Sequence, residues 1–436
     1  MSIRLSFAAA LLASAAPAWA ATHSIEPGEG AQEALQEALI LAEPGDEIVL
    51  AAGRYTLTDG LSLAVDNVTV RGAGMEGTVL DFTGQQGSGE GLLVTSDGVT
   101  LRDFALENPK GDGVKSKGAD NIVYSAIRVT WTGGPDASNG AYGIYPVEST
   151  GILVTGCEVS GASDAGIYVG QSRAITVRDS VATDNVAGIE IENSRDAIVE
   201  RNYVTRNTGG ILVFDLPGLP VTNGGNVIVR DNLVAANNTP NFAPPGNIVA
   251  GVPRGTGIMV MANEKVWIGG NVLRGNPTAP FMVLAYTETF DDDRYNPYPR
   301  EVVIAQNNVD AGATDPDLEG GEMLLAAFGG TLPPILWDGI GAGEDRHTLM
   351  ATPEIGAWSL NLTQQGQSLG EAQPSPADLP AYGQPWDFGA IGAPAELEQR
   401  LGEIPILGRV DIQRPLARHH MRARGRIEHR RARDKG

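Results

Sequence analysis

The sequence predicts an all-β solenoid, a single-stranded right-handed parallel β-helix with a capping helix at its N-terminal end. A step in which glycine precedes an apolar residue recurs along the chain at intervals of 22, 30, 23, 22, 22 and 47 residues. Two further columns of short apolar strands keep the same register, so each period holds three strands and leaves no room for a helix. The glycine steps are Gly91-Leu92, Gly113-Val114, Gly143-Ile144, Gly166-Ile167, Gly188-Ile189, Gly210-Ile211 and Gly257-Ile258.

Alternate side chains of each strand should face the interior of the solenoid, because successive residues of a strand point to opposite faces. We expect Ile167, Ile189 and Ile211 to stack inward on consecutive coils about 4.8 Å apart. Four asparagines precede apolar residues at corresponding turns, and they are predicted to hydrogen-bond to one another along the axis. These are Asn202, Asn232, Asn271 and Asn308.

The N-terminal end of the solenoid carries a helical pattern. Residues 32–42 are amphipathic, with Leu35, Leu39 and Ile40 on one face, and Pro44 follows them. A solenoid exposes its core at each end, so this helix is predicted to cover the first coil.

The pattern weakens toward the C-terminus. Further strands are expected at residues 281–284, 302–304 and 323–326, and the sequence then becomes rich in Pro and Gly. We therefore assign residues 21–330 to the β-helix domain with its cap and residues 331–408 to an irregular C-terminal region. Residues 409–436 hold ten Lys or Arg and three Asp or Glu. This pattern indicates either a flexible basic tail or a patch that adheres to an anionic polymer or membrane surface.

Charge and cysteine content exclude several classes of protein. The formal net charge is −22, which argues against nucleic acid as a partner because phosphate binding requires a basic face. The single cysteine, Cys157, excludes a disulfide framework and a multi-cysteine zinc site, and we interpret it as a buried apolar residue.

The first 20 residues are typical of a secretory signal peptide. Arg4 precedes an apolar run that is too short to span a bilayer, and Ala18-Trp19-Ala20 matches a small-x-small cleavage site. No later run of apolar residues is long enough for a membrane span. We therefore predict a periplasmic or secreted protein whose mature chain starts at Ala21.

The repeat resembles the right-handed parallel β-helix superfamily, which includes pectate-lyase-like and mannuronan C5-epimerase-like proteins. The heptapeptide at residues 142–148, YGIYPVE, is similar to the epimerase pattern Tyr-Gly-Phe-Asp-Pro-His-Asp/Glu. In that pattern the Tyr, Asp and His are catalytic. Here Tyr142, Pro146 and Glu148 match, whereas Tyr145 stands in the place of the Asp and Val147 in the place of the His. The resemblance implies a polysaccharide-active protein, lyase-like or epimerase-like if it is catalytic.

The repeat register gathers polar residues into one outward strip about 14 Å long, which suits a glycan chain. Lyase or epimerase chemistry on a uronate needs a cation to neutralise the carboxylate, together with a base and an acid. Lys115 or Lys117 could neutralise, and Tyr142 could act as base or acid if a nearby ammonium lowers its pKa. The remaining members of the strip are expected to bind substrate, the tyrosines by stacking on sugar rings. They are Tyr145, Tyr168, Glu190, Glu192 and Asp112.

The same residues are also consistent with a solvated face of paired charges, or with tyrosines packed under a loop. Insertions at residues 131–141, 215–225 and 239–256 lie around the strip. No cofactor is required, although calcium could bind Glu190 and Glu192 together with Asp164, or the run Asp291–Asp293.

Two functions follow from the sequence. One is a carbohydrate-active protein that binds a polysaccharide, with uronate lyase-like or C5-epimerase-like chemistry if it is catalytic. The other is a non-catalytic glycan-binding or assembly module of the cell envelope, with a protein partner. A chain this acidic repels a polyuronate unless lysine or calcium offsets the charge locally, and a neutral glycan avoids that problem.

Overall fold

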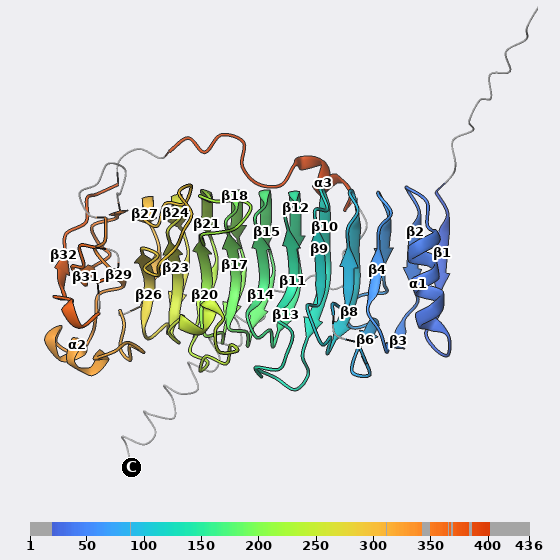
Figure 1. The fold of residues 1–436 in the computed structure, drawn as a ribbon, viewed down its shortest axis with the longest axis horizontal. Helices are drawn as coiled ribbons and strands as arrows, with labels where there is room; N and C mark the ends of the chain where they lie inside the picture. The colour runs from blue at the N-terminus through green and yellow to red at the C-terminus, as the bar shows by residue number, and fades with distance from the viewer. Residues whose placement is uncertain are drawn as a thin grey trace, which may run out of the picture.

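The computed structural model describes residues 20–401, apart from residues 88, 311, 342–348, 365, 368 and 383–385. Most of the predicted signal peptide and the whole basic tail lie outside the described residues. The described chain is a stack of coils whose strands lie side by side along one long axis, with α1 (Ala31–Leu41) at the N-terminal end (Figure 1). Almost all strand pairs are parallel, as the predicted all-β parallel solenoid requires, and the fold class is confirmed.

Each complete coil contributes one strand to a sheet of twelve strands and two strands to a sheet of twenty, counted among the described residues. The twelve-stranded sheet is formed by β4 (Leu61–Leu63), β7 (Leu92–Val94), β9 (Val114–Lys117), β11 (Tyr142–Val147), β14 (Ala165–Gly170), β17 (Ala187–Glu192), β20 (Gly209–Phe214), β23 (Thr256–Met261), β26 (Ala279–Leu284), β29 (Ile335–Trp337), β31 (Ala357–Ser359) and β32 (Ser375–Ala377). Only β32 of this sheet pairs antiparallel.

The twenty-stranded sheet turns around the other two sides of the coils. Its strands are β1 (Thr22–Ile25), β2 (Glu47–Leu50), β3 (Gly53–Thr56), β5 (Thr69–Arg71), β6 (Thr78–Asp81), β8 (Thr100–Glu107), β10 (Ile122–Thr130), β12 (Thr150–Thr155), β13 (Glu158–Ser160), β15 (Arg173–Arg178), β16 (Val181–Thr183), β18 (Arg195–Glu200), β19 (Tyr203–Thr205), β21 (Gly225–Arg230), β22 (Leu233–Ala235), β24 (Glu264–Gly269), β25 (Val272–Arg274), β27 (Arg300–Ala305), β28 (Asn308–Val309) and β30 (Leu349–Ala351).

The interior follows the predicted register. Ile167 pairs with Ile189, which pairs with Ile211, and all three side chains are fully buried. Cys157 is also fully buried, and burial raises the pKa of its thiol to about 12, so it packs as an apolar residue. Columns of inward Ile, Val and Leu therefore form one continuous core along the axis.

Two asparagine ladders run along the turns. In the first, Asn202, Asn232 and Asn271 are linked by side-chain hydrogen bonds of 2.9–3.0 Å, as predicted. The fourth member is Asn307, whose Oδ1 accepts from the Asn271 side chain at 3.0 Å, so the prediction of Asn308 was wrong by one residue. The second ladder was not predicted from the sequence and consists of Asn185, Asn207, Asn237 and Asn276.

The N-terminal cap forms where it was predicted. Leu35 and Leu39 of α1 are buried against the first coil, but Ile40 is 61 % exposed, so its assignment to the buried face was wrong. The apolar face of α1 is completed by Ala31 and Ala38 instead. The described residues contain three further short helices besides the helix α2 (Gly321–Ala327). The 3-10 helix η1 (Ile248–Gly251) lies in an insertion, and the 3-10 helix η2 (Leu369–Glu371) and the helix α3 (Ala395–Gln399) lie near the C-terminal end.

The C-terminal part of the solenoid differs from the sequence-based expectation. The strand expected at residues 323–326 is instead the helix α2 (Gly321–Ala327). Parallel pairing continues past residue 330, where β29 pairs with β26 and β31 pairs with β29. These strands are only three residues long, so they carry little repeat signal.

The chain then returns along the outside of the twenty-stranded sheet (Figure 1). Leu397 of α3 and the following Leu401 pack on Val123 and Leu153 of two middle coils. The Arg400 guanidinium donates to the backbone oxygens of Asn121 and Gly98, at 2.7 and 3.0 Å. In the part of the chain that the structure describes, no helix has the length and apolar character needed to cross a membrane.

Candidate functional site

The register brings the predicted strip residues onto four neighbouring strands, β9, β11, β14 and β17. Lys115 pairs with Tyr145, and Tyr168 pairs with Glu190 on the following coil. Their side chains point away from the core, as predicted, yet several of them are not solvated. Tyr168 is 3 % exposed and Glu190 is 1 % exposed.

Three tyrosines form one aromatic cluster at the centre of this face. The ring centroids of Tyr142 lie 4.5 Å from those of both Tyr145 and Tyr168, and the latter two are 4.9 Å apart. Tyr142 and Tyr145 are partly exposed. These two rings are therefore the members of the cluster that a sugar ring can reach from solvent.

Beside the tyrosines lie three acidic side chains, Asp164, Glu190 and Glu192, which we call the acid cluster. The Tyr142 hydroxyl donates to Asp164 Oδ2 at 3.3 Å, and the Tyr168 hydroxyl donates to Glu192 Oε1 at 2.8 Å. Glu190 Oε1 and Asp164 Oδ1 are buried and have no hydrogen-bond partner among the described residues. Within that part of the chain, no Lys or Arg forms a salt bridge with any of the three.

Burial without a cation shifts these carboxyls toward their neutral forms. Burial, and after it the charge of the nearby Glu192, raise the pKa of Asp164 to about 7. Burial likewise raises the pKa of Glu192 to about 7. The pKa of Glu190 is raised by burial first and then by the charges of Asp164 and Glu192. The acid cluster therefore holds protons at neutral pH.

The acid cluster has the opposite effect on Tyr142 from the one expected. Burial raises the pKa of the Tyr142 hydroxyl, and the charges of Asp164, Glu190 and Glu192 raise it further. The expectation that a nearby ammonium lowers this pKa was wrong, because carboxyls rather than a lysine surround the hydroxyl. Tyr142 is therefore suited to donating a hydrogen bond and is poorly suited to removing a proton.

Lys115 is neutralised by its own surroundings. Its Nζ lies 3.1 Å from Glu90 Oε1, 3.4 Å from Asp112 Oδ2 and 4.7 Å from the Tyr145 ring centroid. Burial lowers the pKa of Lys115, but the two carboxylates outweigh this effect and the pKa is raised overall. The cation is thus balanced by Glu90 and Asp112 before any substrate arrives.

The other two predicted residues lie at the edge of the cluster. Lys117 is 57 % exposed at its side chain and pairs with Glu148 at 3.5 Å, which is the arrangement of an ordinary surface salt bridge. Asp112 accepts from the Tyr142 backbone N–H at 3.3 Å, and burial raises the pKa of Asp112.

Sequence reasoning missed two participants in this site. Asp164 was considered only as a calcium ligand, although it stands two residues before a glycine step and so lies beside the outward strip. Glu90 directly precedes Gly91, the position that Asp112 occupies one coil later. Extending the column before the glycines by one coil would have found Glu90.

The structure offers no ligand set for the calcium ion that was considered. Among the described residues, no group of three or more His, Cys, Asp or Glu side chains is arranged to hold a metal ion. Asp292 of the Asp291–Asp293 run is instead paired with Arg294, whose hydrogen bonds lower the pKa of Asp292 to about 2.

Comparison with protein families agrees with this architecture. A family model described as the right-handed beta helix region matches residues 59–216 and 137–294, which together cover more than half of the chain. The chain belongs to the right-handed β-helix family. No curated protein sequence matches this β-helix protein.

Solved structures resemble the β-helix protein in fold. One is the N-terminal fragment of bacteriophage Phi29 gene product 12, with a TM-score of 0.52 and 15 % identity over 75 % of this chain and 60 % of the phage fragment. Another is the A-module of the mannuronan C-5 epimerase AlgE4 of Azotobacter vinelandii, with a TM-score of 0.46 and 14 % identity over 76 % of this chain and 94 % of the module. A third is an alginate lyase of Paenibacillus sp. str. FPU-7, with a TM-score of 0.45 and 18 % identity over 67 % of this chain and 96 % of the lyase. At identities this low, the likeness concerns the fold alone.

Proposed function

We propose that this protein is a secreted or periplasmic carbohydrate-active protein that binds a glycan across the tyrosines and uses the acid cluster to break or transfer a glycosidic bond. One observation carries the proposal: three carboxyls are buried together without a cation among the described residues. Burying such groups opposes folding, and proteins retain them chiefly where their protonation state is used. The secreted or periplasmic location rests on the signal-peptide pattern of residues 1–20.

Cleavage of a glycosidic bond needs one carboxylic acid that is protonated at the working pH and a second carboxyl that is ionised. The pKa values of Asp164 and Glu192, both raised by burial to about 7, suit the acid. Because charges in the cluster oppose one another, loss of one proton makes loss of the next harder. Acid and base forms therefore coexist near neutral pH, which is the condition that this chemistry requires.

The surroundings favour a neutral or cationic glycan over a uronate. Removal of the C5 proton of a uronate requires a cation beside its carboxylate. Lys115 is already paired with Glu90 and Asp112, and Lys117 with Glu148. An anionic sugar brought to this face would meet more carboxylates than free cations, so lyase or epimerase chemistry is the less supported alternative.

A second candidate function is binding without catalysis, and the burial of Glu190 favours it. At 1 % exposure, this carboxyl is reached by a sugar only if the side chains around it move. A face presenting Tyr142 and Tyr145 as stacking rings, with the acid cluster locked beside them, would bind a glycan and leave it intact.

Screening the purified protein against neutral, amino-sugar and uronate polysaccharides tests the proposal, with binding and chain cleavage measured separately. We expect cleavage of a neutral or cationic glycan that Glu192→Gln abolishes and Lys115→Ala leaves largely intact. Asp338→Asn is the matched control, because burial also raises the pKa of Asp338 to about 7 but its carboxylate accepts the backbone N–H groups of Ala285 and Ile340. Binding without cleavage of any glycan would favour the second candidate, and cleavage of uronates alone with loss in Lys115→Ala would contradict the proposal.

A further inference from the structure

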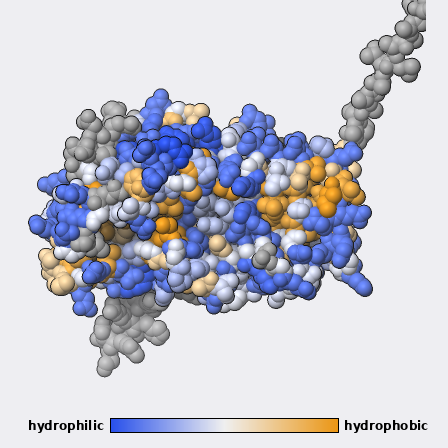
Figure 2. Space-filling view, viewed as in Figure 1, coloured by the Kyte–Doolittle hydropathy of each residue, from blue (hydrophilic) through white to orange (hydrophobic). Residues whose placement is uncertain are grey.

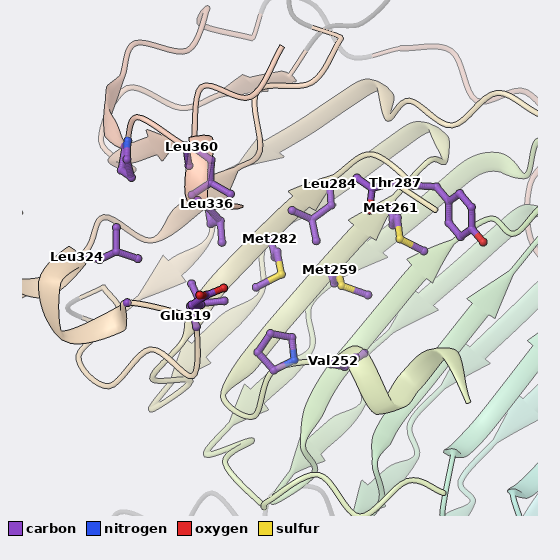
Figure 3. Close-up of a pocket in the computed structure, with 18 of the residues that line it drawn as sticks. Val252, Met259, Met261, Met282, Leu284, Thr287, Glu319, Leu324, Leu336 and Leu360 are labelled. Carbon is purple, nitrogen blue, oxygen red and sulfur yellow. The ribbon is translucent and has the colours of Figure 1, made fainter. Parts of the chain in front are cut away.

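The outward face of the twelve-stranded sheet changes from acidic to apolar beyond the acid cluster. A pocket of about 700 Å³ opens over β23 and β26 (Figure 3), and apolar patches lie among hydrophilic residues on this part of the surface (Figure 2). The three clustered tyrosines, Tyr142, Tyr145 and Tyr168, do not line this pocket, and neither does the acid cluster. The outward residues of β20, β23 and β26 are Leu212, Phe214, Met259, Met261, Met282 and Leu284.

Methionine dominates the sheet side of the pocket. Met259 and Met282 project into the same space from neighbouring strands, with Leu324 and Glu319 on the opposite side (Figure 3). Four of the eight methionines of the chain line the pocket, the others being Met261 and Met323. Methionine side chains are flexible and polarisable, so they adapt to an apolar ligand that has no fixed shape.

The rim of the pocket combines apolar and acidic groups. Met323 is 75 % exposed and Ile248 is 41 % exposed, and they are two of the four large apolar side chains most exposed among the described residues. Glu288 and Glu319 also lie at the rim, and no Lys or Arg is among the described lining residues. A ligand that enters here therefore meets apolar surface first and carboxylates beside it.

We propose that this pocket binds the alkyl chain of an amphipathic molecule whose head group is uncharged or cationic. The volume lies within the range of about 300–1,000 Å³ that is usual for small-molecule sites, and the lining is apolar with a few polar groups at one side. The methionines suit a flexible chain, and the two carboxylates repel an anionic head. This site lies beyond the proposed glycan function and does not depend on it.

Displacement of the uncharged fluorophore N-phenyl-1-naphthylamine from the purified protein tests the proposal. Octyl, decyl and dodecyl ethers of tetraethylene glycol, used below their micelle concentrations, should displace it with affinities that rise about fourfold for each added methylene. Dodecyltrimethylammonium should bind at least about tenfold more tightly than dodecanoate, because the rim is acidic.

Two variants and a control connect the binding to this pocket. Met259→Phe replaces a flexible lining side chain with a rigid ring, and Met323→Glu places a further charge at the exposed rim, so each should weaken binding of the dodecyl ether at least about tenfold. Ile40→Glu makes the same kind of change at an exposed residue of α1, far along the axis, and should have no effect. The comparison of Met323→Glu with Ile40→Glu still tests the proposal if Met259→Phe misfolds, because both of these residues are largely exposed.

Several results would overturn the proposal. They are failure of the ethers to displace the fluorophore, affinities that do not depend on chain length, tighter binding of dodecanoate than of the cation, or unchanged binding in Met323→Glu. The alternative is a dimer that excludes the fluorophore. A dimer that light scattering detects and that Met323→Glu dissociates would also overturn the proposal, because a second copy of the chain would then occupy the pocket.

Discussion

The Tyr168 hydroxyl donates a hydrogen bond of 2.8 Å to Glu192 Oε1 on the next coil of the β-helix. Burial raises the pKa of Glu192 to about 7, while this hydrogen bond acts in the opposite direction by favouring the carboxylate. The tyrosine thus satisfies one oxygen of a carboxyl that has no cationic partner among the described residues. The pair shows how the aromatic and acidic parts of the site depend on each other.

The raised pKa values predict that the protein is more stable in mild acid than at neutral pH. Asp164 and Glu192 have folded-state pKa values of about 7, whereas unfolded Asp and Glu titrate near 4. Between these values the folded chain holds protons that the unfolded chain has lost, so stability falls as pH rises from about 4.5 to 7. The melting temperature should be a few degrees higher at pH 5 than at pH 8.

The matched variant for this prediction is Glu192→Gln, which removes one of the titrating groups. The free energy of unfolding of this variant should depend less steeply on pH, by up to about 1.4 kcal/mol per pH unit. Its melting temperature should therefore change less between pH 5 and pH 8 than that of the wild type. Below about pH 4 the trend should reverse, because Asp46 and Asp292 have pKa values lowered to about 2 and lose their favourable interactions there. A melting temperature that rises steadily from pH 5 to pH 8 would refute this account of the acid cluster.

The asparagine ladder predicts different effects for two adjacent residues. Asn307→Ala removes an acceptor for the backbone and side-chain N–H groups of Asn271, as well as a donor to the Ile268 carbonyl. We expect it to lower the free energy of unfolding by about 1–3 kcal/mol. Asn308 is exposed and accepts from Arg274 at the surface, so Asn308→Ala should cost less than about 0.5 kcal/mol. Equal effects in urea denaturation would mean that the ladder ends before these residues.

The inward register is tested by the substitution Ile189→Asp. Ile189 is fully buried between Ile167 and Ile211, and an aspartate there would bury an unpaired carboxyl in the core. We expect a loss of about 4 kcal/mol or more, measured by chemical denaturation. The same substitution at the exposed Ile40 should change stability by less than about 1 kcal/mol. A melting temperature of Ile189→Asp within a degree of the wild type would show that the side chain faces outward.

The packed C-terminal segment predicts a local effect. Leu397 is 1 % exposed and packs on Val123 and Leu153. Leu397→Ser should therefore release α3 from the middle coils and expose amides near residue 153 to hydrogen exchange, while the coils themselves remain folded. Glu396→Ser changes an exposed residue of the same helix and serves as the control, which should exchange like the wild type. If hydrogen exchange near residue 153 is also unchanged in Leu397→Ser, α3 contributes nothing to the protection of these coils.

The repeat made the coils predictable because each coil repeats the evidence of its neighbours. Ile167, Ile189 and Ile211 lie in one column, and an error of register at one of them would conflict with the other two. Ile40 had no such support, because the helix occurs only once and no neighbouring repeat checks its orientation. The buried face of the helix is centred on Leu35 and Leu39, which leaves Ile40 on the exposed side. Asn308 was misassigned for a related reason: two asparagines are adjacent, and the pattern cannot tell which one faces the turn.

The candidate site was only partly predictable, because its burial depends on segments outside the repeat. The outward column from Lys115 to Glu190 follows from the register alone. That Glu190 is buried does not, because loops and aromatic rings from other coils cover an outward position without leaving a periodic signal. The insertion at residues 239–256 illustrates this point, since its Val249 and Val252 pack in one apolar cluster with Leu212.

The central claim, that the acid cluster performs proton transfer on a bound glycan, is tested most directly by the pH dependence of kcat/KM on whichever glycan the protein cleaves. We predict that kcat/KM falls as pH rises above about 7, where the raised-pKa carboxyls lose their protons, and that Glu192→Gln lowers it at least about 1,000-fold while the Kd for the glycan changes little. Cleavage that is independent of pH from 5 to 8.5, or that survives in Glu192→Gln, would contradict the account.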